Sequence, residues 1–303
     1  MSSSTPVHTQ TRLSDRTVAR THQPRSHSRR RLITVLVSTA ALLIVAVFWF
    51  SPFIVLLMTS IRSSADFSQN GALALPRSFT FSNFAEAWSV GDFSHTYLNS
   101  AIVTLVKVPL GVIISAMLAF ALAKLKLPGR KIVLAGVFIG LTIPIYITIL
   151  PLFETVKSLG LIDNIFGLIG PYLAFGIPFE VLVLHSFFRR VPEELFEAAR
   201  VDGASNWRIF FQIMLPLSIP ALVTVAILDA VSTWNELLMA VIILNSDVNK
   251  TLPLGLLNFQ GQFGTNFTGL AAGILIAVVP MLVAYAILQR WIVSGLTAGA
   301  IKG

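Results

Sequence analysis

The feature that most constrains this chain is a series of six apolar stretches, each long enough to cross a lipid bilayer. They cover residues 32–58, 98–123, 132–153, 165–188, 217–244 and 269–292. About 20 apolar residues span the hydrocarbon core, and a helix satisfies its own backbone hydrogen bonds where no water is present. The sequence therefore predicts an all-α, polytopic membrane protein with six transmembrane helices.

The charge content agrees with this prediction. Only 12% of the 303 residues are charged, whereas an ordinary soluble domain has about one quarter. This low content excludes a solvated globular enzyme, a nucleic-acid-binding domain and a disordered chain. Within the predicted spans, prolines are expected to kink helices or break them locally. These prolines include Pro52, Pro109, Pro144, Pro178 and Pro280.

Residues 1–31 differ from the rest of the chain. They are rich in Ser, Thr, His and Arg and almost free of large apolar residues. Such a segment buries too little surface to offset its ordering entropy, so we expect a disordered basic tail followed by one transmembrane domain over residues 32–303. Arg29, Arg30 and Arg31 resemble a twin-arginine export signal, but the apolar stretch after them is longer than a signal peptide needs.

Basic residues are distributed unevenly between the two sides of the predicted spans. Seventeen of the 22 Lys and Arg residues flank one side and four flank the other, while Lys107 lies within the second span. The positive-inside rule then places both termini in the cytoplasm. The formal charge of +8 is thus a signal of membrane orientation, and we expect no nucleic-acid partner.

Several chemistries have no residues to support them. The chain has no cysteine, so it has no disulfide, no cysteine metal site and no thiol nucleophile. It lacks the GxxxxGK[ST] phosphate loop of an ATPase and the HExxH and GxSxG motifs of proteases. We expect a protein that is not an enzyme and holds no metal.

The cytoplasmic loop over residues 189–216 has the pattern of a helix–turn–helix. Pro192 followed by two glutamates is typical of a helix start, and Gly203 permits a turn with positive φ that ends this helix. Ser205 can then cap a second short helix. From the residues alone, the loop either docks into a groove on a partner protein or lies against the lipid headgroups.

The same loop resembles a signature of one transporter family. Glu197-Ala198-Ala199, then Gly203, then Ile213-x-Leu215-Pro216 match the EAA signature of ABC importer permeases at the family's spacing. Val201-Asp202-Gly203-Ala204-Ser205, Trp234-Asn235-Glu236 and the C-terminal Gly-rich segment resemble its carbohydrate-uptake, maltose-type branch. The similarity runs from about residue 32 to residue 303.

The resemblance implies a type I ABC importer permease in a bacterial plasma membrane. Such a permease pairs with a second, different permease, and an extracellular or periplasmic protein delivers the sugar. ATP is bound by two partner ATPase subunits, so this chain itself needs no cofactor. The signature residues would contact the ATPase: Glu197, Ala198, Ala199, Gly203, Ile213, Leu215 and Pro216. The sugar itself is not indicated by the sequence.

Polar residues inside the spans are candidates for the translocation path, because a charge at the bilayer centre is costly and usually faces protein or water. Asp229 lies about 18 Å along the fifth span, from the helical rise. We expect Asp229, Trp234, Asn235 and Glu236 along the path, with the alternative that such residues join helices. Helix joining is favoured for Lys107 and Glu180.

Two other functions remain open from the sequence. An ion-coupled secondary transporter would explain the charges in the membrane but not the EAA loop. Within the ABC family, the cargo could instead be glycerol phosphate or a polyamine. An anionic cargo would favour a cationic path, for which Lys107 is the single candidate.

Overall fold

The computed structural model describes residues 26–261 and 264–300, with side chains from Arg31 to Gly261 and from Gly264 to Gln289. The chain divides into two compact units, Met1–Pro52 and Phe53–Gly303. The described part is mostly helical, as predicted, and its one sheet is a two-stranded pairing of β1 (Gln260–Gly261) with β2 (Gly264–Thr265).

The first unit holds most of helix α1, Ser26–Ser60. Its apolar sequence and length fit the predicted first span, and Pro52 lies within the helix. The helix begins at Ser26, before Leu32, where the predicted span starts. The predicted disordered tail covers residues 1–31; its last six residues, 26–31, lie in α1 instead, and residues 1–25 lie outside the described residues.

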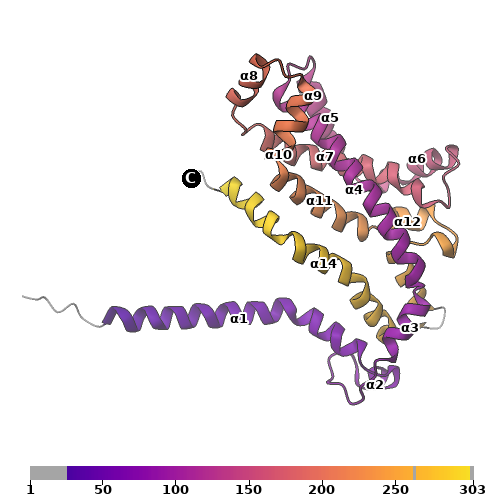
Figure 1. The fold of residues 1–303 in the computed structure, drawn as a ribbon. Coiled ribbons are helices and arrows are strands. Elements are labelled where there is room, and N and C mark those ends of the chain that lie inside the picture. The colour runs from indigo at the N-terminus through magenta and orange to yellow at the C-terminus, as the bar shows by residue number, and fades with distance from the viewer. Residues whose placement is uncertain (1–25, 262–263, 301–303) are drawn as a thin grey trace, which may run out of the picture. The chain divides into compact units, whose positions relative to one another are not determined.

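The second unit is built around long apolar helices. They are α4 (Phe93–Lys124), α7 (Ile169–Phe188, extended at its start by the 3-10 turn η1, Ile165–Leu168), α11 (Ile219–Trp234) and α14 (Phe267–Ala300). Helix α4 packs against α7 and α11, and α11 packs against α14 (Figure 1). Small residues permit this approach, since a Cβ on Gly111 of α4 would lie 3.1 Å from Glu180 Oε1 on α7.

Two of the predicted spans are broken rather than continuous. Residues 132–153 fall in α5 (Arg130–Thr142) and α6 (Ile145–Ser158), which are bent by 102° where Pro144 interrupts the backbone ladder. Residues 217–244 divide into the end of α10 (Leu215–Leu217), α11 and α12 (Leu238–Ile243). Among the described residues, four helices are long and apolar enough to cross a membrane, or up to six if each bent pair counts as one span.

Short helices connect the long ones. Between α1 and α4 lie α2 (Ser64–Asn70) and α3 (Ser82–Val90), and between α7 and α11 lie α8 (Glu194–Val201), α9 (Asn206–Ile209) and the π-helical turn η2 (Phe210–Met214). After α12 come η3 (Asp247–Asn249), α13 (Leu252–Leu256) and η4 (Leu257–Phe259). In Figure 1, α8 and α9 lie at one end of this unit and α2 and α3 at the other.

The segment after α1 is held by a buried arginine. The Arg62 side chain is fully buried and forms an ion pair with Asp66 at 3.0 Å, while its Nη1 donates to the carbonyl oxygens of Gly71 and Ala74. Because Arg62 donates to the Asp66 carboxylate and the Arg77 backbone N–H does so as well, the pKa of Asp66 lies well below its usual range.

Candidate functional site

Helix α8 is anchored to the second unit by one aromatic side chain. Phe196 is fully buried, and its ring centre lies 6.4 Å from that of Phe120 on α4. The Phe120 ring lies in turn 5.3 Å from Phe210 on η2. This side of α8 thus packs into a core that joins α4 to the segment after the turn.

Lys124, the last residue of α4, ties the start of this loop to the same core. Its Nζ donates to the carbonyl oxygen of Val191 at 2.7 Å and to Glu193 Oε2 at 3.2 Å. The same ammonium group lies 4.8 Å from the centre of the Phe196 ring, within the range of a cation–π contact. In the sequence, Lys124 is one of the basic residues that flank the predicted spans, and no local pattern indicates its distant partners.

The turn after α8 has the predicted conformation. Gly203 has φ +76°, where a side chain would be strained, and the Ala204 backbone N–H donates to the Ala199 carbonyl oxygen at 2.9 Å. The Ser205 hydroxyl accepts from the Arg208 backbone N–H and caps α9. We call residues Glu193–Ser218, with α8 at one side and α9, η2 and α10 at the other, the α8 hairpin.

The structure places the signature residues on the accessible part of this hairpin. Glu197, Ala198, Gly203 and Pro216 are exposed, and Ala199, Ile213 and Leu215 are half-buried. The exposed set presents a carboxylate and small residues, while the buried anchors Phe196 and Phe210 hold the backbone behind them. This arrangement leaves these residues accessible on the surface of the hairpin.

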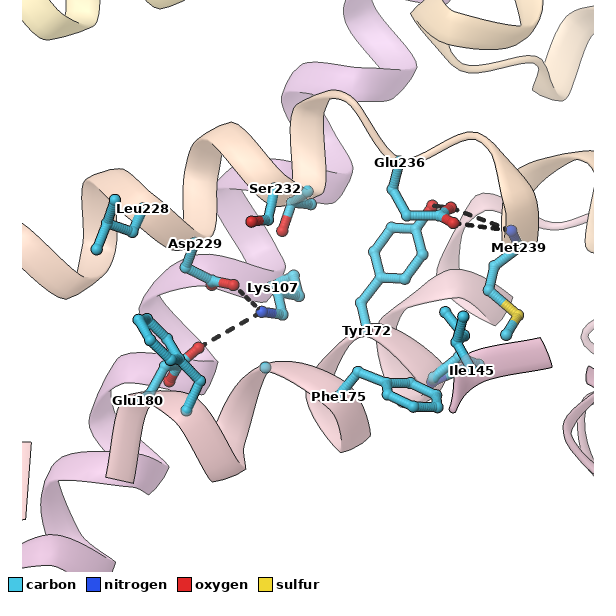
Figure 2. Close-up of a pocket in the computed structure, with 14 residues that line it drawn as sticks. Lys107, Ile145, Tyr172, Phe175, Glu180, Leu228, Asp229, Ser232, Glu236 and Met239 are labelled. Carbon is cyan, nitrogen blue, oxygen red and sulfur yellow. Dashed lines mark hydrogen bonds and ion pairs between the residues drawn. The ribbon is translucent and has the colours of Figure 1, made fainter. Parts of the chain in front are cut away.

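A second candidate region is a cavity of about 280 Å³ between α4, α7 and α11 (Figure 2). At one end, Lys107 of α4 is enclosed by two carboxylates. Its Nζ lies 3.5 Å from Glu180 Oε1 of α7 and pairs with Asp229 Oδ1 of α11. Glu180 Oε2 also accepts from the Ser115 hydroxyl at 2.7 Å. This confirms the prediction that Lys107 and Glu180 join helices.

Glu236 lies at the other end of the cavity, just after α11 ends (Figure 2). Its Oε2 accepts from the Tyr172 hydroxyl at 2.6 Å, and its Oε1 accepts from the Met239 backbone N–H at 2.9 Å. Glu236 therefore caps the first turn of α12 and joins it to α7. The aromatic side chains of Tyr172, Phe175 and Phe179 also line the cavity.

The four predicted path residues do not lie together. Asp229 and Glu236 line the cavity, whereas Trp234 and Asn235 do not. The Trp234 indole N–H donates to the Ala277 carbonyl oxygen of α14 at 3.2 Å, and its ring packs against Tyr97. Asn235 is exposed and donates to the Val231 carbonyl oxygen at 2.8 Å, within its own helix.

An acidic side chain also joins two connecting segments outside the cavity lining. Asp163, at φ +56°, accepts from the backbone N–H groups of Asn245 and Ser246, each at 2.9 Å. These two backbone hydrogen bonds lower the pKa of Asp163 to about 2. In the part of the chain that the structure describes, no group of three His, Asp or Glu side chains could hold a metal ion.

Comparison with known proteins identifies the family. Residues 107–298 match the model of the family described as the binding-protein-dependent transport system inner membrane component. The diacetylchitobiose uptake system permease protein of Streptomyces coelicolor is 35% identical, over 88% of this chain and 88% of its own length. The trehalose transport system permease protein of Mycobacterium tuberculosis is 36% identical, over 76% of this chain and 84% of its own.

Further similarities agree with these. The melibiose/raffinose/stachyose import permease protein of Bacillus subtilis is 33% identical, over 90% of this chain and 97% of its own length. Among solved structures, a bacterial ABC transporter that imports the acidic polysaccharide alginate has a chain with a TM-score of 0.72 and 26% identity, covering 89% of this chain and 99% of that chain. The chain therefore belongs to the binding-protein-dependent transport system inner membrane components, as a permease of the carbohydrate-uptake branch of the ABC importers.

Proposed function

We propose that this chain is the membrane-spanning subunit of an ATP-driven sugar importer and that the α8 hairpin couples it to a cytoplasmic ATPase. The relatives that import diacetylchitobiose, trehalose and raffinose support a sugar as the cargo. One observation carries the coupling role. The hairpin exposes Glu197, Ala198 and Gly203 while the buried Phe196 fixes it to α4.

In this proposal the chain crosses the membrane six times, with each bent helix pair counted as one crossing. Both termini and the α8 hairpin lie in the cytoplasm, which the uneven distribution of basic residues supports. The segments around α2 and α3 then face the outside, where a sugar-binding protein delivers the cargo. A second permease completes the path, and the partner ATPase subunits bind ATP.

The contacts of the hairpin suggest how ATPase motion reaches the membrane. A push on α8 moves Phe196, whose ring packs on Phe120, and Lys124 holds Val191 and Glu193 to the end of the same helix. Helix α4 therefore follows α8 as one body. Because α4 carries Lys107, the motion extends to α7 and α11 through its two carboxylate partners. A rigid-body switch between inward-open and outward-open states fits this connection.

We assign Asp229 and Glu236 to the translocation path because both line the cavity between these moving helices. Carboxylates suit sugar hydroxyls as hydrogen-bond acceptors, and the nearby aromatic side chains suit the apolar faces of sugar rings. The cavity of about 280 Å³ is just below the range of about 300–1,000 Å³ typical of small-molecule sites. It would hold only part of an oligosaccharide, so the partner permease would contribute the rest.

The coupling role is tested by two glycine variants with matched strain. Gly203 and Gly129 have φ values of +76° and +74°, and neither has an atom within 4 Å of an added Cβ. Gly203→Asp and Gly129→Asp therefore impose similar backbone strain, but only the first alters the α8 hairpin. The assay is uptake of labelled trehalose, diacetylchitobiose and raffinose by the assembled transporter in proteoliposomes, together with co-purification of the ATPase.

We expect Gly203→Asp to abolish uptake while the subunit still inserts, and Gly129→Asp to retain uptake. Normal uptake by Gly203→Asp would contradict the coupling role. Removing ATP while an ion gradient is maintained tests the alternative of a secondary transporter. Uptake that persists without ATP would overturn the ATP-driven mechanism itself.

A further inference from the structure

The cavity between α4, α7 and α11 contains one polar atom that its surroundings leave unsatisfied. Asp229 is 7% exposed, and its Oδ1 pairs with Lys107. Its Oδ2 is buried and has no hydrogen-bond partner among the residues that the structure describes. A buried carboxylate oxygen without a donor is unfavourable, so this atom is suited to accept a hydrogen bond from a ligand.

The charge of the cavity excludes one class of ligand. Apart from Tyr172, four ionisable residues line the cavity: Lys107, Glu180, Asp229 and Glu236. They are one cation and three carboxyl groups. The ammonium group of Lys107 is already enclosed by the carboxylates of Asp229 and Glu180 (Figure 2). No cationic donor remains free in this lining to pair with an anionic cargo. A carboxylate or phosphate on the ligand would instead face Asp229 and Glu236.

The remaining lining suits an uncharged ligand with hydroxyl groups. Ser232 and Thr233 provide hydroxyls between the two acidic ends, and Phe175 and Phe179 provide apolar faces. Sugar hydroxyls can donate to Asp229 Oδ2 while the ring packs on an aromatic side chain. The same groups that accept such hydroxyls would repel an anion.

We propose that this cavity is a sugar subsite that selects uncharged, hydroxyl-rich glycans and disfavours carboxylated or phosphorylated ones. Asp229 is the residue that determines this specificity, because its free oxygen accepts the sugar hydroxyl and its charge opposes anions. The proposal deepens the proposed function and depends on sugar passing through this subunit.

The absence of cysteine permits a direct test of the cavity's charge. Ser232→Cys places a thiol on the cavity wall, and Asn235→Cys places one on the same helix end but off the cavity. In the assembled permease–ATPase complex, with cysteines removed from its partners, each thiol is treated with a cationic and with an anionic methanethiosulfonate reagent. At each position, the ratio of the two modification rates reports the local electrostatic potential. The two reagents differ in intrinsic reactivity, but this difference cancels when the ratios at the two positions are compared.

We expect the cation-to-anion ratio at Ser232→Cys to exceed that at Asn235→Cys by about tenfold, since charged clefts focus their field. Adding Asp229→Asn should bring the ratio close to the control value. Because that variant changes a buried ion pair, Glu236→Gln serves as a second variant and should also lower the ratio. Equal ratios at the two positions, or a Ser232→Cys thiol that reacts with neither reagent, would overturn the proposal.

Sugar protection tests the ligand class. Trehalose and raffinose should slow modification of Ser232→Cys by the uncharged reagent N-ethylmaleimide, and a disaccharide of alginate should not. Equal protection by the acidic disaccharide would contradict the selection we propose. Sugar uptake by the unmodified transporter is measured separately. If the unmodified transporter takes up no sugar, the proposed function is contradicted. If it takes up sugar but sugar does not protect the Ser232→Cys thiol, only the subsite is contradicted.

Discussion

Gly176 on α7 offers a sharp test of how tightly the buried charges are held. An added Cβ at this position would lie 2.5 Å from Lys107 Nζ, 3.1 Å from Glu180 Oε1 and 3.3 Å from Asp229 Oδ1. Non-bonded heavy atoms settle at about 3.5–4.0 Å, so Gly176→Ala requires the ammonium group to move by about 1 Å. Carboxylates hold this group from two sides, so any such movement lengthens at least one ion pair.

The expected loss of stability follows from comparison with a glycine that has space for an added methyl group. Overpacking of a filled interior costs about 1–3 kcal/mol, whereas alanine in a helix interior is favoured over glycine by about 1 kcal/mol. Gly136 on α5 has nothing within 4 Å of an added Cβ, so Gly136→Ala carries the propensity gain without the clash. We therefore expect Gly176→Ala to be less stable than Gly136→Ala by about 1–3 kcal/mol.

The assay is thermal unfolding of the purified permease complex, in which gel filtration of heated samples measures the fraction that remains folded. At about 2–4 °C per kcal/mol for a chain of this size, Gly176→Ala should melt roughly 2–12 °C below Gly136→Ala. Wild-type protein sets the reference for both. A melting temperature for Gly176→Ala at or above that of Gly136→Ala would refute the view that the carboxylates fix the ammonium group.

Three further predictions concern other contacts of the chain. Lys124→Met should raise the number of ATP molecules hydrolysed per sugar imported by about fivefold, the lower end of typical couplings, because Val191 and Glu193 lose their hydrogen bonds to α4. Lys126→Met, at an exposed position, is the control. An equal ATP-to-sugar ratio in the two variants would contradict this prediction. Tyr172→Phe should lower stability by about 1.5–3 kcal/mol, measured by thermal unfolding, since it removes the hydrogen bond to a carboxylate; an unchanged melting temperature would speak against it. The pKa of Asp163 is lowered to about 2 in the folded protein, so its stabilising effect is present above an unfolded-state pKa of about 3.9 and is lost as the pH falls from there toward 2. Asp163→Asn should therefore weaken the dependence of melting temperature on pH in this range, and an identical dependence would show that Asp163 is not responsible.

The sequence was sufficient to predict the long helices and the α8 hairpin, because both depend on local patterns. Apolar length determines the spans, and the spacing of Pro192, Gly203 and Ser205 determines where the short helices begin and end. The 102° bend at Pro144 was not predictable in size. Proline removes a hydrogen bond, but the packing of neighbouring helices sets the angle.

The candidate path was predicted only in part. A helix turns by about 100° per residue, so Trp234 lies about 140° around α11 from Asp229, on a different face. The indole N–H accordingly meets α14 and not the cavity. Helical periodicity in the sequence therefore already separates Trp234 from Asp229. The pairing of Lys107 with Glu180 and Asp229 was beyond local patterns, since these partners lie 73 and 122 residues further along the chain.

That separation has a consequence for how the protein is made. Lys107 reaches the ribosome exit well before its partners, because Asp229 follows 122 residues later. At about 5–20 residues per second, synthesis of the intervening chain takes roughly 6–24 s. During this interval an ammonium group in the middle of α4 would cost about 2.5–3.5 kcal/mol in lipid. Helix α4 should therefore leave the insertion machinery late, together with α7 and α11, so that the three helices enter the bilayer as one charge-paired group.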